Sequence, residues 1–122
     1  GDATTHKWKQ PIGAVAGETY LGAPLTSLPK PDDLRKIIEN TNAIHQKFLQ
    51  NIADQLQPGT RLCLAVPAWS VVKGAFLRLP VLDHLKELGY NEVKFVHASK
   101  RDLIYHRENQ HVARELVVIT KE

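Results

Sequence analysis

A helical pattern over residues 30–59 constrains the fold more than any other feature of the sequence. Pro31 suits a first helical position, two aspartates follow in the first turn, and Pro58 and Gly59 end the pattern. Mostly apolar side chains recur at helical spacing and form one stripe: Leu34, Ile37, Ile38, Thr41, Ile44, Phe48, Ile52 and Leu56. Because such a stripe has to pack against another layer, the sequence predicts a long helix that covers a core.

Short apolar runs on both sides of this helix predict strands. Residues 11–17 (PIGAVAG) are small and apolar without helical periodicity, which favours a buried strand. Residues 61–67 (RLCLAVP) are apolar on both alternating faces, a pattern typical of a central strand with helices on each side. This order predicts a right-handed crossover between parallel neighbours.

The second half of the chain is predicted to complete the sheet. After an irregular connection over residues 68–80, residues 81–89 predict a short helix with its leucines inward. Residues 92–98 alternate like a strand, and residues 102–120 predict two extended pieces joined near residues 108–110. We therefore expect an α/β fold whose sheet is mainly parallel, with an antiparallel last strand and helices on the faces.

Length and composition exclude several classes of protein. A chain of 122 residues is predicted to form a single domain, residues 1–122. The apolar fraction of 43% and the charged fraction of 24% argue against wholesale disorder. No run approaches the roughly 20 apolar residues of a membrane span, and the N-terminus lacks the layout of a signal peptide. We therefore expect a cytoplasmic protein.

Reactive side chains are few in the sequence. The single cysteine, Cys63, lies in an apolar run and is predicted to be a buried, inert thiol. The six histidines show no metal-ligand spacing, and no nucleophile elbow supports hydrolase chemistry. We thus expect no metal site. The net charge of +3 permits a nucleic-acid partner without requiring one.

The loop after the first predicted strand carries the most specific pattern. In GETYLGAPL (residues 17–25), Glu18, Thr19 and Tyr20 follow one another. This loop resembles the one after the fourth strand of amino-methylating nucleic-acid enzymes, particularly RNA methylases related to tRNA guanine-N2 methyltransferases. Their pattern is an acid or an asparagine, then one or two prolines, then an aromatic residue. Thr19 stands where a proline is usual.

The remainder of the chain extends this resemblance. The opening GDAT (residues 1–4) resembles the loop after the third strand, so Asp2, with Ala3 beside it, is the implied contact to the cofactor's adenine. RENQHVARELVVITK (residues 107–121) resembles the tail of the same methylases. The order of elements resembles the C-terminal half of a class I, Rossmann-like, S-adenosylmethionine-dependent methyltransferase, whose sheet carries an antiparallel seventh strand beside the sixth.

The resemblance implies a function for the parent protein. It implies the substrate-side portion of an S-adenosylmethionine-dependent amino-methyltransferase acting on nucleic acid, with RNA favoured over DNA. No glycine-rich strand-to-helix turn occurs in the sequence. We therefore predict a fragment without the N-terminal cofactor-binding half, inactive alone, and a homodimer through the sheet edge that this leaves bare. The alternative is a non-catalytic α/β module for binding or assembly.

The implied chemistry assigns a role to each candidate residue. Methylation of an exocyclic amine needs alignment, an acceptor for the amine hydrogens and a surface on which the base stacks. Glu18 would be the acceptor in a loop with Thr19, and Tyr20 would stack on the base. Pro67 and Trp69, at the end of the central strand, would line the base pocket. The alternatives are an ordinary turn residue at Asp2 and a solvated acid or helix-cap partner at Glu18. For Tyr20 the alternative is a ring at the edge of the core, and for Trp69 a ring that covers the edge of the sheet.

Overall fold

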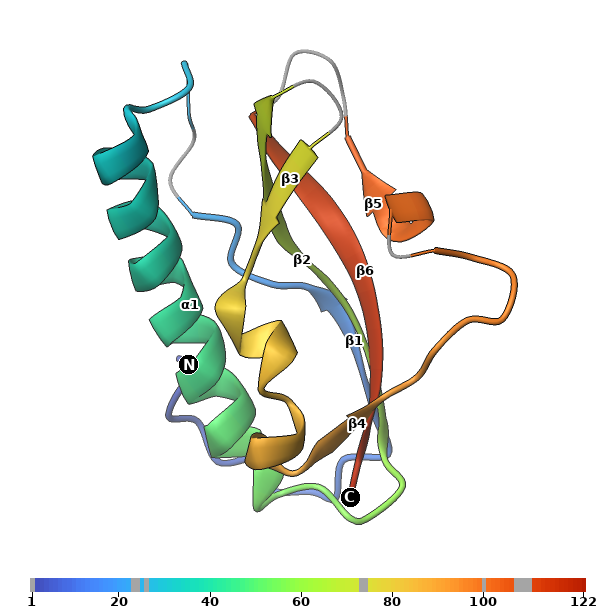
Figure 1. The fold of residues 1–122 in the computed structure, drawn as a ribbon. Helices are drawn as coiled ribbons and strands as arrows, with labels where there is room; N and C mark the ends of the chain where they lie inside the picture. Colours follow the sequence, from blue (N-terminus) through green and yellow to red (C-terminus); the bar gives the residue numbers. More distant parts are fainter. Residues whose placement is uncertain (1, 23–24, 26, 73–74, 100, 107–110) are drawn as a thin grey trace.

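The computed structural model describes residues 2–22, 25, 27–72, 75–99, 101–106 and 111–122, which form one sheet and one long helix (Figure 1). The helix is α1 (Pro31–Ala53), and it begins where Pro31 fixes the backbone for a first turn. The strands are β1 (Ala14–Glu18), β2 (Arg61–Val72), β3 (Ala75–Arg78), β4 (Tyr90–Glu92), β5 (Ile104–Tyr105) and β6 (Val112–Lys121). Short 3-10 helices are η1 (Pro80–Asp83), η2 (Lys86–Leu88) and η3 (Arg101–Leu103).

The sheet is mixed, as predicted, and its order is β1-β2-β6-β4. β1 pairs with β2 in parallel, whereas β6 is antiparallel to β2, β4 and β5. The strands β1, β2, β4 and β5 therefore run in one direction. Most ladders are nevertheless antiparallel, because the last strand, β6, lies between β2 and β4, and β3 folds back on β2.

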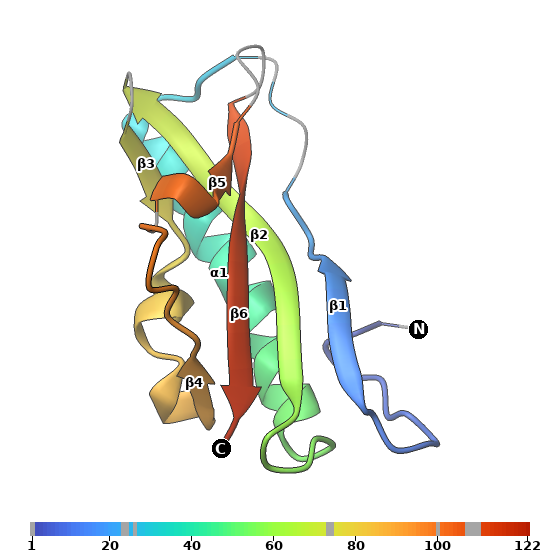
Figure 2. The ribbon, with the colours of Figure 1, turned by 90° about the vertical axis from the view of Figure 1, so that its right-hand side faces the viewer.

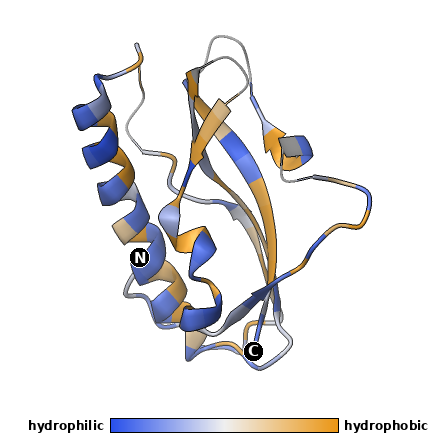
Figure 3. Cartoon of the chain, viewed as in Figure 1, coloured by the Kyte–Doolittle hydropathy of each residue, from blue (hydrophilic) through white to orange (hydrophobic). Residues whose placement is uncertain are grey.

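One face of the sheet is covered by α1, and the core lies between these two layers (Figures 1 and 2). The hydropathy of α1 differs between its two sides, hydrophobic toward the sheet and hydrophilic toward solvent (Figure 3). On β2, Leu62, Leu64 and Val66 are buried, but Cys63 and Ala65 are only half-buried. The predicted helix on each side of this strand, and the buried Cys63, are thus wrong for the described residues. None of their helices is long and apolar enough to span a membrane.

The predicted strands differ from the observed ones where a sheet neighbour is missing or added. β1 is an edge strand in which Val15 is half-buried and the rest is exposed, because β2 alone pairs with it among the described strands. The irregular connection predicted over residues 68–80 instead extends β2 and forms a hairpin with β3. The strand predicted over residues 92–98 is wrong beyond its first residue, because β4 covers Tyr90–Glu92 and Val96 is 90% exposed.

The helical prediction for residues 30–59 is correct up to Ala53, where α1 ends before the predicted stop at Pro58, and the prediction for residues 81–89 is wrong. The buried positions of α1 are Leu34, Ile38, Thr41, His45, Leu49 and Ile52, so the stripe excludes Ile44, which is exposed. Residues 81–89 form the short turns η1 and η2 rather than one helix. Gly89 still ends η2, and its φ of 92° lies in the left-handed region that glycine adopts without strain.

The predicted homodimer remains a prediction, and the structure gives it a specific edge. In the sheet order, β1 is a terminal strand with a neighbour on one side only (Figure 2). A strand edge with open backbone groups tends to pair with another chain. We expect sedimentation equilibrium to give a dimer at high protein concentration, and Ala16→Pro to weaken it because proline removes a backbone donor. A monomer at all concentrations would contradict this prediction.

Candidate functional site

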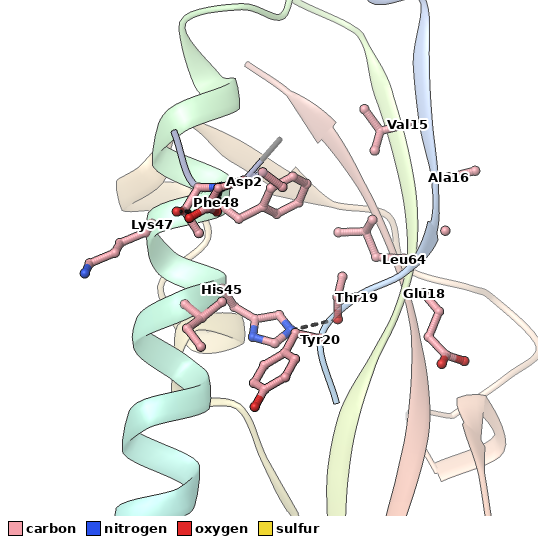
Figure 4. A pocket seen from close by; sticks show the side chains of 14 residues that line it. Asp2, Val15, Ala16, Glu18, Thr19, Tyr20, His45, Lys47, Phe48 and Leu64 are labelled. Carbon is pink, nitrogen blue, oxygen red and sulfur yellow. Dashed lines mark hydrogen bonds between the residues drawn. The ribbon is translucent and has the colours of Figure 1, made fainter. Parts of the chain in front are cut away.

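A cleft of about 670 Å³ lies between α1 and the C-terminal end of β1 (Figure 4). Its volume is within the range of roughly 300–1,000 Å³ of small-molecule sites. Apolar side chains form its walls, and polar groups lie at two of its sides. The lining residues are Asp2, Ala3, Thr4, Val15, Ala16, Gly17, Glu18, Thr19, Tyr20, Ile44, His45, Lys47, Phe48 and Leu64.

The N-terminal segment reaches the cleft because α1 holds it. Asn51 donates from Nδ2 to the carbonyl oxygens of Ala3 (3.0 Å) and His6 (2.9 Å). Asp2 closes a turn, since its Oδ1 accepts from the Thr4 backbone N–H (2.9 Å) and hydroxyl (2.7 Å). These bonds to Thr4 lower the pKa of Asp2. The acid predicted to contact a cofactor is thereby an ionised group at the cleft.

Thr19 is anchored to both layers of the fold. Its backbone N–H donates to the Ala65 carbonyl on β2 (3.0 Å), and its hydroxyl lies 3.2 Å from the same oxygen. On the other side, the Thr19 hydroxyl lies 2.7 Å from Nε2 of His45 on α1 (Figure 4). The predicted catalytic loop is therefore pinned between the sheet and the helix at its second residue.

His45 is a functional candidate that the sequence reasoning missed. It is 4% exposed, and its Nδ1 lies 2.7 Å from the Thr41 carbonyl oxygen. Because a carbonyl only accepts, Nδ1 carries the proton and Nε2 presents a lone pair to Thr19. Burial lowers the pKa of His45 and favours this neutral form, against the opposing effect of the Thr41 bond. The feature of the sequence that could have indicated His45 is its position four residues after Thr41, on the buried stripe of the helix.

Glu18 and Tyr20 lie on opposite sides of the loop. The Glu18 carboxylate points away from His45 and Tyr20 (Figure 4), and its Oε2 accepts from Nε of Arg114 at 2.6 Å. Arg114 comes from β6, 96 positions later, and sequence reasoning missed this pairing. The Tyr20 ring is 51% exposed and lines the same cleft as His45, where a planar ligand could stack on it.

The predicted site residues fall into two groups in the structure. Asp2 and Ala3 line the same cleft as the loop that carries Thr19. Pro67 and Trp69 do not line it, because both are fully buried within β2, and the indole Nε1 of Trp69 has no hydrogen-bond partner among the described residues. No group of three or more His, Cys, Asp or Glu side chains able to hold a metal occurs in the part of the chain that the structure describes.

Comparisons with known proteins give a fold but no family. No protein-family model and no curated protein matches the chain. A crystal structure of a candidate DNA modification methylase from Thermus thermophilus is similar, with a TM-score of 0.51 and 14% identity over 100% of this chain and 52% of that chain. Its selenomethionine derivative has a TM-score of 0.48, with 12% identity over 92% of this chain and 45% of that one. Its complex with S-adenosyl-L-methionine has a TM-score of 0.41, with 14% identity over 93% and 48%.

The first of these structures supports a methyltransferase-like fold for the described sheet and helix. The chain spans about half the length of that structure. At 14% identity the likeness concerns the fold alone and assigns no substrate or cofactor to this chain.

Proposed function

We propose that the cleft binds S-adenosylmethionine together with an amine of a nucleic-acid base, as the substrate-side portion of an amino-methyltransferase. One observation supports the proposal above others. Asp2 and Ala3, assigned to the cofactor, and Glu18, Thr19 and Tyr20, assigned to the substrate, are separated in sequence but line one cleft. An apolar cleft lined by segments from separate parts of the sequence is typical of a ligand site.

The residues present fit part of this cofactor. Phe48, Leu64 and Val15 offer an apolar wall to an adenine ring, and the Asp2 carboxylate offers an acceptor for amine or hydroxyl hydrogens. Only one of the two Asp2 oxygens is used in the turn with Thr4. When bound, the cofactor supplies a sulfonium methyl group, so the chain has to align an amine with it rather than activate a leaving group.

The loop after β1 supplies the substrate side of the proposal. Tyr20 stacks on the base. The role of Glu18 as acceptor of the amine hydrogens stays a prediction, because its carboxylate is paired with Arg114 and points away from Tyr20, so it would first have to turn toward the base. Thr19 fixes the loop between them. The contacts predicted for Pro67 and Trp69 stay predictions, because both side chains lie beneath the surface and would first have to be uncovered.

Titration with S-adenosylhomocysteine, followed by NMR of the labelled protein, tests the cofactor half. We expect saturable shifts at Asp2, Thr4 and the loop that carries Thr19, because these residues line one cleft. Phe48→Ala should weaken binding about tenfold or more, since a buried ring face is lost from the adenine wall. The matched control Phe95→Ala removes an exposed ring outside the cleft and should leave binding unchanged. Unmoved cleft resonances at millimolar ligand would overturn the cofactor assignment.

The nucleic acid is tested separately, with single-stranded RNA and DNA of the same sequence. The proposal favours RNA, and Tyr20→Ala should weaken binding of either strand, because stacking on an aromatic ring contributes about 1–3 kcal/mol per base. If DNA binds more tightly than RNA, DNA rather than RNA would be the substrate class. If neither strand binds and the cofactor does not bind either, the alternative of a non-catalytic α/β module for binding or assembly would be favoured.

A further inference from the structure

We propose that His45 is a positioning residue that holds the loop after β1 in place through the Thr19 hydroxyl. The inference rests on the proposed function only in one respect, the identity of the ligand that the loop binds. The positioning itself follows from the contacts of Thr19 and His45, which belong to two different layers of the fold.

The geometry of the pair leaves little freedom to either side chain. His45 is 4% exposed at the middle of α1, and the Thr41 carbonyl fixes its ring from the far side at 2.7 Å. Its Nε2 then faces the Thr19 hydroxyl at 2.7 Å as an acceptor. The hydroxyl has one hydrogen, and its distance to the Ala65 oxygen is longer, 3.2 Å, so the bond to His45 is the better one.

The position of Thr19 in the chain gives this bond its consequence. Ladder pairing of β1 with β2 ends at Glu18, and only the Thr19 backbone N–H continues it. From there the chain leaves the sheet and crosses toward α1, with Tyr20 at the mouth of the cleft (Figure 4). A hydroxyl bonded to the helix at this point fixes where the backbone turns and therefore where the Tyr20 ring is presented.

This arrangement also explains why a buried histidine occupies a stripe that is apolar apart from Thr41. A polar side chain on a buried helix position costs stability unless its hydrogen bonds are made. Both nitrogens of His45 have a partner, and one of these partners is the loop itself. The imidazole thus lets a buried position of α1 form a hydrogen bond with the loop that lines the cleft.

Amide hydrogen exchange of the full chain tests the inference without any ligand. In Thr19→Val the hydroxyl is lost, and in His45→Leu the acceptor is lost, so exchange at the Thr19 and Tyr20 amides should rise roughly two- to tenfold. Thr19→Ser keeps a hydroxyl and should restore protection. Amide exchange at Leu49 and Ile52 on α1 reports whether the helix stays folded. If His45→Leu unfolds, Thr19→Val still tests the inference, because it changes no core residue.

Two further readouts separate positioning from bulk stability. Nitrogen NMR of the wild-type imidazole should show a protonated Nδ1 and an acceptor Nε2. Thr19→Val and His45→Leu should be non-additive, because each removes the same bond. Unchanged protection in Thr19→Val, or a protonated Nε2 in the neutral ring, would overturn the inference. If protection falls while S-adenosylhomocysteine fails to bind wild type, the positioning stands and the proposed function fails. If S-adenosylhomocysteine binds wild type but protection is unchanged in the variants, the proposed function stands and the positioning role fails.

Discussion

Arg78→Leu should destabilise the fold by roughly 3–5 kcal/mol, because it leaves the Glu115 carboxylate buried without its partner. Glu115 is 2% exposed, and it accepts from Arg78 Nε at 2.8 and 3.0 Å and from Nη2 at 2.6 Å. These hydrogen bonds from the guanidinium to Glu115 raise the pKa of Arg78 against the effect of burial. Urea unfolding of both proteins at pH 7, with the slope checked for constancy, measures the difference.

The matched variants distinguish a buried charge from simple loss of a contact. Arg78→Leu with Glu115→Leu should recover much of the loss, because no unpaired charge remains in the core. Arg35→Leu breaks an exposed pair with Asp32 (3.9 Å) and should cost about 1 kcal/mol or less. A cost below 1 kcal/mol for Arg78→Leu would mean that water or a cation reaches Glu115.

The consequence for the cleft comes from the neighbouring residue of β6. Arg114, directly before Glu115, holds the Glu18 carboxylate on the side of the loop opposite Tyr20. Successive side chains of a strand point to opposite faces, so one dipeptide of β6 anchors the β3 hairpin on one face and the loop acid on the other. Loosening β6 through Arg78 should therefore also displace Glu18.

The parts of the fold that the sequence predicts are those that depend on local pattern. α1 carries its own start at Pro31 and its own apolar stripe, and β2 is recognisable from its apolar run. The edge position of β1 and the β2–β3 hairpin were missed, because both depend on which strands become neighbours. The same holds for the chain after Glu92, where alternation continues but hydrogen bonding to β6 stops after the Val93 N–H, which donates to the Val118 carbonyl.

The site shows the same division between local motif and distant partner. Asp2 and the loop with Thr19 were recognisable as short motifs, and the structure brings them to one cleft. His45 and Arg114 were missed because their partners lie 26 and 96 positions away. Without the register of β6 on β2 and the rotation of α1, a sequence does not indicate which histidine meets which hydroxyl.

The stability of the protein should fall between neutral and mildly acidic pH because of His45. Burial lowers its pKa below the ordinary value of 6.5, so just below that pH the unfolded chain binds a proton that the folded chain does not. Stability then rises with pH through this window and is fully present above pH 6.5. One such group contributes a slope of at most about 1.4 kcal/mol per pH unit, which ends where the folded imidazole itself protonates.

Urea unfolding of wild type and His45→Gln from pH 7.5 to 5 measures this contribution. The other five histidines are common to both proteins, so the difference in slope belongs to position 45. The charged groups that line the same cleft are Asp2, Glu18 and Lys47, and all three also remain in the variant. The variant carries an uncharged side chain at every pH in this range and should therefore show a flatter profile. Parallel profiles for the two proteins would show that the imidazole protonates without unfolding cost, and that water rather than the core surrounds it.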